Sequence, residues 1–221
     1  MTKIKGKTSV SEITENAVGA DAHIDPGSCG QLPLQKISKK PKFLEGKIKL
    51  TRAEIGTITH LIMQKLDFSM EYDEDKLREL IDSLVEKEII SHQEAEAVPI
   101  SNILRFTESE LYNRIQGSKK VFKEQPFYIN IPAKEIYANG IEENILVQGI
   151  IDIYFVDDED NIILVDYKTD YIKSGNEQEL INKYQKQLMM YKQAIEESTG
   201  KKVEETYIYS MYLGKDILVA N

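Results

Sequence analysis

The sequence has a single cysteine, no tryptophan and no long apolar run. One cysteine, Cys29, excludes an internal disulfide framework, a cysteine-based zinc site and a four-cysteine iron–sulfur cluster. No stretch approaches the ~20 apolar residues that are needed to cross a bilayer. The N-terminal residues also lack the apolar core of a secretory signal. These absences predict a cytoplasmic protein with no membrane partner.

Positive charge is scarce outside the first part of the chain. The 221 residues carry a formal net charge of −9. Residues 1–50 hold nine lysines and five acidic residues, a net +4, so the remainder carries −13. This balance argues against indiscriminate binding of polyanions. It does not exclude a divalent-cation site, because such a site itself requires carboxylates.

The length predicts one domain with a tail. Glycines, prolines and a basic cluster are scattered over residues 1–42, which we interpret as a linker or poorly ordered lead-in. The folded domain is expected over residues 43–221. The sequence has no G-x-x-x-x-G-K-[ST] motif, so a P-loop ATPase motor is not expected in it.

The hydrophobic period changes once along the folded part. Apolar residues first recur at helical spacing, and after Ser118 they form short apolar or alternating runs that are typical of strands. The predicted helices cover about 51–66, 74–88, a segment from 91, and turns through 100–114. The predicted strands cover 121–131, 146–156 and 162–168, then a helix covers 177–198 and strands cover 203–213 and 217–219. This order predicts an α/β domain with a mixed β-sheet flanked by helices.

The candidate chemistry lies between the second and third predicted strands. Asp152 interrupts an apolar strand, where an ionised carboxylate is costly unless it is paired or bound to metal. Asp166 and Lys168 share one face of the next strand. If the two strands pair through the polar turn 157–161, Asp152 comes opposite or diagonal to Asp166, which makes a site for a hard cation. The alternatives are a solvated strand edge and an Asp152 that bonds a backbone N–H group or an arginine.

Six motifs in this order resemble a known family. They are Gly56-Thr57-Ile58-Thr59-His60, Glu124-Gln125-Pro126-Phe127, Ile131-Pro132-Ala133-Lys134-Glu135-Ile136-Tyr137, Val147-Gln148-Gly149-Ile150-Ile151-Asp152, Val165-Asp166-Tyr167-Lys168-Thr169-Asp170 and Gln187-Leu188-Met189-Met190-Tyr191. The chain resembles the RecB-type branch of the PD-(D/E)XK nuclease superfamily over about residues 45–219, and within it the AddA group of nuclease domains. The resemblance implies a restriction-endonuclease-like mixed sheet with an N-terminal helical segment.

The resemblance also implies roles for individual residues. Asp152, Asp166 and Lys168 would be catalytic. The metal ligands would be His60, Asp152, Asp166 and the backbone carbonyl of Tyr167, and the ion would be Mg²⁺, with Mn²⁺ as the alternative. The residues supporting the site or the substrate would be Gln187, Tyr191, Tyr184 and Glu124.

The function that the resemblance implies is that of a metal-dependent, exonuclease-type deoxyribonuclease. It would be the nuclease part of an AddAB/RecBCD-type helicase–nuclease acting in double-strand-break repair and recombination. DNA would reach it as a single strand from the motor, and an AddB-like subunit would be its protein partner. Two alternatives remain open: a non-catalytic nuclease-like module that docks or steers DNA, and a stand-alone nuclease of the same superfamily.

Overall fold

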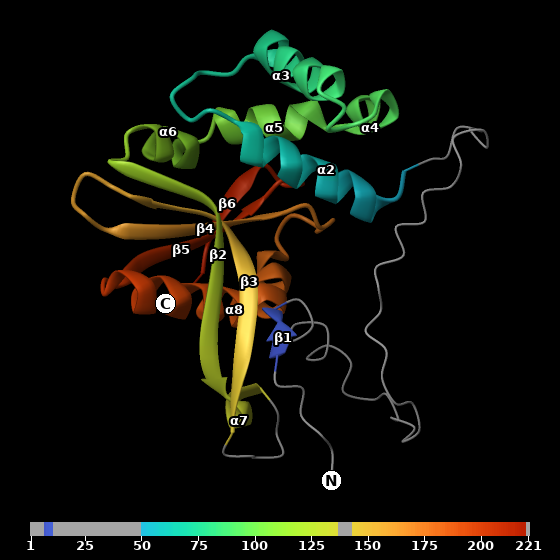
Figure 1. Cartoon of the computed structure of the whole chain (residues 1–221). Coiled ribbons are helices and arrows are strands. Elements are labelled where there is room, and N and C mark those ends of the chain that lie inside the picture. Colours follow the sequence, from blue (N-terminus) through green and yellow to red (C-terminus); the bar gives the residue numbers. More distant parts are fainter. Residues whose placement is uncertain (1–6, 11–49, 137–142, 220–221) are drawn as a thin grey trace, which may run out of the picture.

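Two layers of helices enclose a mixed β-sheet in the computed structural model, which describes residues 7–10, 50–136 and 143–219 (Figure 1). The short helices that precede the long strands cover one face of the sheet, and one long helix covers the other. This arrangement confirms the predicted class, a mixed sheet flanked by helices with an N-terminal helical segment.

The first helical layer begins where the sequence offers a side-chain cap. Thr51 and Ser91 each form a reciprocal capping box with the glutamate three residues later. Ser109 accepts a hydrogen bond from the backbone N–H of Tyr112, so a new helix starts there and the helical stretch expected over 100–114 is divided. The helices of this layer are α2 (Arg52–Lys65), α3 (Glu74–Glu86), α4 (His92–Ala97), α5 (Ile100–Thr107) and α6 (Glu110–Gln116).

The sheet is organised around one long strand, β3 (Asn144–Val156). The antiparallel strand β2 (Lys120–Pro132) pairs with β3 over its whole length. The opposite edge of β3 is shared, because β1 (Lys7–Ser9) pairs with Leu146–Gln148 and β4 (Ile162–Lys168) pairs only with Ile153–Val156. The strands β5 (Val203–Ser210), parallel to β4, and β6 (Lys215–Leu218) complete the sheet, and the short helix α7 (Ala133–Ile136) follows β2.

The alternation of side chains in β4 divides the interior into two cores. Ile163, Val165 and Tyr167 pack among the helices α2 to α6. Ile162 and Leu164 pack on the opposite face against the long helix α8 (Glu177–Thr199). Since successive side chains of a strand point to opposite faces, Asp166 and Lys168 belong to the α8 face.

One part of the expected lead-in is structured. Lys7–Ser9 form β1 within the segment interpreted as a linker, and Val10 is 3% exposed in the core beside α8. The expected boundary at residue 42 lies outside the described residues, as does Cys29. In the described part of the chain, no helix combines the length and the apolar composition of a membrane span.

Candidate functional site

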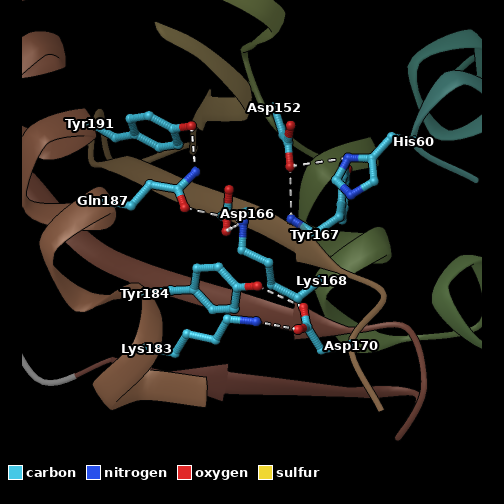
Figure 2. A network of polar contacts seen from close by, with 10 residues as sticks. All are labelled: His60, Asp152, Asp166, Tyr167, Lys168, Asp170, Lys183, Tyr184, Gln187 and Tyr191. Atoms are coloured by element: carbon cyan, nitrogen blue, oxygen red, sulfur yellow. Dashed lines mark hydrogen bonds and ion pairs between the residues drawn. The ribbon is translucent and has the colours of Figure 1, made fainter. Parts of the chain in front are cut away.

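Asp152 lies where β3 and β4 separate. The last pair of residues in the β3–β4 ladder is Ile153 and Val165, so the two strands are no longer paired at Asp152. Here a side chain bridges the strands instead, since Oδ2 of Asp152 accepts a hydrogen bond of 3.0 Å from the backbone N–H of Tyr167 (Figure 2). The buried carboxylate is therefore fixed at the gap between the two strands.

Asp166 and Lys168 form an ion pair on the α8 face of β4. Nζ of Lys168 is 2.6 Å from Oδ2 of Asp166, and the side chains of Lys168 and Asp166 are 11% and 2% exposed. Burial raises the pKa of Asp166 to about 6, although the positive charge of Lys168 opposes the shift. Burial would lower the pKa of Lys168, but the charge of Asp166 outweighs it and raises that pKa. Lys168 is therefore a cation at neutral pH.

Helix α8 places three of the expected supporting side chains around Lys168. Nζ of Lys168 donates to Oε1 of Gln187 at 3.4 Å, and Nε2 of Gln187 donates to the hydroxyl of Tyr191 at 2.6 Å. The ring of Tyr184 lies below the ammonium, with Nζ 4.2 Å from the ring centroid. Tyr184, Gln187 and Tyr191 are spaced by three and four residues, so they share one face of the helix (Figure 2).

Two members of this network had no role assigned from the sequence. Oδ2 of Asp170 accepts a hydrogen bond of 2.7 Å from the hydroxyl of Tyr184, and Oδ1 lies 2.6 Å from Nζ of Lys183. The signal was present in the sequence, since Asp166, Lys168 and Asp170 alternate along one strand end. These contacts hold the Tyr184 ring beneath Lys168.

His60 reaches the site from α2, which crosses the opposite side of the strand gap. Its Nδ1 is 3.6 Å from Oδ2 of Asp152. Burial would lower the pKa of His60, but its hydrogen bond to Asp152 and the charge of that group raise it. Burial alone would raise the pKa of Asp152, but the hydrogen bond to His60 and the charges of His60 and Lys168 outweigh burial and lower that pKa. The structure thus brings together two side chains 92 residues apart that no local pattern connects.

Glu124 occupies a distorted position beside Asp152. Its φ of 50° is left-handed, and it is missing from the pairing register between the rows of Lys123 and Gln125. The pKa of Glu124 is raised, first by burial and then by the negative charge of Asp152. Glu124 and Asp152 are thus close enough for the charge of Asp152 to act on Glu124.

The site has an excess of buried acid. Asp152 and Asp166 are both largely buried, Glu124 adds a further carboxylate, and Lys168 is the one lysine paired with them among the described residues. Oδ2 of Asp166 has no well-directed hydrogen bond within the described part of the chain, apart from the ion pair to Lys168. Oxygen atoms of this kind suit a hard divalent cation.

The ligand set itself is not preassembled. Among the residues that the structure describes, no three histidine, cysteine or acidic side chains form a ready cluster around one point. The donor types therefore fit a metal ion, while His60, Asp152, Asp166 and the Tyr167 carbonyl as its ligands remain a prediction.

The sequence is similar to a known nuclease family and to parts of longer proteins. The family described as the PD-(D/E)XK nuclease superfamily matches residues 34–216. The chain is 40% identical over 211 residues to an ATP-dependent helicase/nuclease subunit from Alkaliphilus metalliredigens (strain QYMF), covering 94% of this chain and 17% of that protein. Proteins with the same description from Clostridium novyi (strain NT) and Acetivibrio thermocellus are 41% and 39% identical, over 82% and 96% of this chain and 15% and 17% of theirs.

The chain spans about a sixth of the length of these curated relatives. The match nevertheless includes both β-strands of the gap, α2 with His60, and α8 with Gln187 and Tyr191. The region of similarity to the ATP-dependent helicase/nuclease subunits and the family match together cover most of the chain, and the chain belongs to the PD-(D/E)XK nuclease superfamily.

Proposed function

We propose that this domain is a divalent-metal-dependent deoxyribonuclease, and that Mg²⁺ is its ion. The observation that carries the proposal is the buried carboxylate pair at the gap between β3 and β4, with the Lys168 ammonium 2.6 Å from Asp166. Asp152 and Asp166 would hold the ion, together with His60 and the carbonyl of Tyr167. A divalent ion at this position supplies Lewis-acid polarisation of a phosphate oxygen and lowers the pKa of bound water.

Lys168 acts as a positive charge and not as a base in this proposal. Its pKa is raised, so at neutral pH it keeps its proton and donates hydrogen bonds. A phosphate that undergoes attack gains negative charge on its oxygens, and a preorganised ammonium stabilises that charge without reorganisation. Loss of one such donor typically costs roughly 10²- to 10³-fold in rate. Lys168→Ala is accordingly expected to lose rate while the carboxylates still bind metal.

The α8 network keeps that ammonium in place. Gln187 contacts Lys168 and is itself held by the hydroxyl of Tyr191. The ring of Tyr184 lies on the other side of Nζ. Lys168 has a flexible four-carbon stem, so these contacts restrict its position before substrate arrives.

The cellular role is inferred from the relatives. Their description names an ATP-dependent helicase/nuclease, and this chain matches about a sixth of their length. We infer that the domain cuts a single DNA strand in an exonuclease manner, as the nuclease part of such a machine, with an AddB-like partner, in double-strand-break repair in the cytoplasm. The acidic balance of the chain suits a domain that relies on other subunits to grip DNA.

Cleavage of end-labelled single-stranded DNA tests the proposal. The 221-residue chain is incubated with Mg²⁺ at low ionic strength, and Asp166→Asn is compared with Asp82→Asn. Asp82 is an exposed carboxylate on α3, which makes it a matched control. We expect cleavage by the wild type and by Asp82→Asn, and none by Asp166→Asn or in EDTA.

Two outcomes contradict parts of this proposal. Cleavage that persists in EDTA or in Asp166→Asn would remove the assigned site. A folded wild type that binds Mg²⁺ by calorimetry but cuts no DNA would instead favour the non-catalytic docking module.

A further inference from the structure

A cavity of about 240 Å³ opens next to the site, at the end of β4 and β5 where α2 and α5 approach the sheet. Its lining includes Arg52 and Gly56 from α2, Asn102 from α5, Tyr171 from the segment after β4, and Tyr212 from the turn after β5. It is smaller than the ~300–1,000 Å³ of a drug-sized ligand site. A single flat ring system is therefore a suitable size of occupant.

Two exposed tyrosines form one wall of this cavity. The side chains of Tyr171 and Tyr212 are 58% and 44% exposed, and their ring centroids are 4.7 Å apart in an edge-to-face arrangement. An edge-to-face pair keeps ring faces available for a further aromatic group. Exposed aromatic rings of this kind are the usual stacking platforms for unpaired bases.

Arg105 connects this wall to α5. Its Nη2 donates to the backbone oxygen of Tyr212 at 3.3 Å and to Oδ1 of Asn102 at 2.6 Å. The Arg105 side chain also packs within about 3 Å of where a Cβ would lie on Gly214, whose φ is +63°. The tyrosine turn and α5 are thereby linked, and the Asn102 NH₂ group keeps its two N–H donors, since only its amide oxygen bonds to Arg105.

Helix α2 connects the cavity to the acidic site. Gly56 lines the cavity, and His60 lies four residues later on the same helix face, 3.6 Å from Asp152. On the sheet side, Thr169 lines the cavity and directly follows Lys168. A Cβ on Gly56 would lie 2.7 Å from Oγ1 of Thr169, so the absence of a side chain is what allows this close approach.

We propose that this cavity binds one unpaired nucleobase of the DNA strand whose neighbouring phosphate reaches Asp152 and Lys168. The inference rests on the proposed nuclease function. Tyr171 and Tyr212 supply stacking and the Asn102 amide supplies a donor for a base edge. Arg52 is exposed at the rim and supplies a cation for the backbone phosphate. The same arrangement rejects a base pair, because a duplex cannot place one base in so small a cavity without unpairing it.

Binding in EDTA tests the base subsite independently of cleavage. Fluorescence anisotropy at low ionic strength compares a short oligothymidylate with an abasic oligonucleotide of equal length, which has the same phosphates and no bases. We expect the full wild-type chain to prefer the oligothymidylate by roughly 5- to 150-fold, the range for stacking of one base on aromatic side chains. The double variant Tyr171→Ala/Tyr212→Ala should bind the two oligonucleotides alike, and Tyr171→Phe/Tyr212→Phe should keep the preference.

The matched control is Tyr128→Ala, because Tyr128 is 64% exposed on β2 and does not line the cavity. It should keep the wild-type preference. Equal binding of both oligonucleotides by the wild type, or an unchanged preference in the double alanine variant, overturns the subsite. A base preference in EDTA without any cleavage in Mg²⁺ contradicts the nuclease proposal and leaves the subsite supported, whereas cleavage without base preference contradicts the subsite alone.

Discussion

Replacing Lys168 with methionine should destabilise the fold in a pH-dependent way. Nζ of Lys168 and Oδ2 of Asp166 are 2.6 Å apart, and both side chains are largely buried. At an effective dielectric constant of about 20, two unit charges at that distance attract by about 6 kcal/mol. Lys168→Met keeps a side chain of similar length and leaves Asp166 buried without its partner. Removing one member of a buried pair typically costs about 3–5 kcal/mol.

The pH dependence follows from the direction of the Asp166 shift. Burial raises the pKa of Asp166 to about 6 from its ordinary value of 3.8, and loss of Lys168 raises it further. A carboxyl group whose pKa is higher in the folded state than in the unfolded state costs stability when it ionises. That cost begins as the pH rises past the pKa of the group in the unfolded chain, and it is complete above its pKa in the folded protein. The loss of stability in Lys168→Met is therefore expected at about pH 8 and should shrink near pH ~5, where Asp166 is protonated in the variant.

Urea unfolding followed by circular dichroism in EDTA measures this difference. Lys186→Met removes an exposed lysine from α8 and serves as the matched control, for which little change is expected at either pH. In the Asp166→Asn background, Lys168→Met should lose most of its pH dependence, because the carboxylate 2.6 Å from Nζ is gone and only the weaker influence of Asp152 remains. An equal loss of stability at both pH values, or the same dependence in the Asp166→Asn background, would refute the reasoning.

Three further substitutions have defined outcomes. Gly56→Ala should be destabilising by about 1–3 kcal/mol in urea unfolding, because the new methyl group would lie 2.7 Å from Oγ1 of Thr169, and Thr169→Ala should relieve the loss. Tyr184→Phe keeps the ring under Nζ but loses the hydroxyl and its 2.7 Å hydrogen bond, so kcat should fall only several-fold, as for about 1 kcal/mol, while Tyr184→Ala should lower it further. Arg114→Met removes a bidentate ion pair, in which Nη1 and Nη2 each lie 2.9 Å from a carboxylate oxygen of Glu205. The pair is remote from the site, so the variant should lower the urea midpoint of unfolding and leave cleavage per folded molecule unchanged. Since Arg114 lowers the pKa of Glu205, its stabilising effect should be present above pH ~4.5 and be lost as the pH falls through the lowered value.

The β3–β4 region shows what a sequence predicts well. Both strands were expected from segments rich in Ile, Val, Leu and Tyr, and the structure has them at Asn144–Val156 and Ile162–Lys168. The polar turn between them also has its expected basis, because Oδ1 of Asp157 accepts hydrogen bonds from the N–H groups of Glu159 and Asn161. The shared face of Asp166 and Lys168 follows from the two-residue period alone.

Other features depend on contacts between distant segments. The approach of His60 to Asp152 is set by how α2 packs across the sheet, and only the family resemblance connected the two residues beforehand. Glu124 belongs to a strand by its sequence pattern, but its left-handed backbone arises from the irregular pairing of β2 with β3. Lys7–Ser9 form a strand because β3 offers them an edge about 140 residues later, which no local periodicity reports.

That short strand has a practical consequence for preparing the protein. A recombinant fragment that starts at residue 43 would lack Lys7–Ser9, so the Leu146–Gln148 edge of β3 would have unpaired N–H and C=O groups. The fragment would also lack Val10, which packs so closely on Gly149 that a Cβ on Gly149 would lie 3.2 Å from the Val10 side chain. Open edges of long strands template pairing with other molecules. Such a truncated preparation should self-associate at concentrations at which the intact chain stays dispersed.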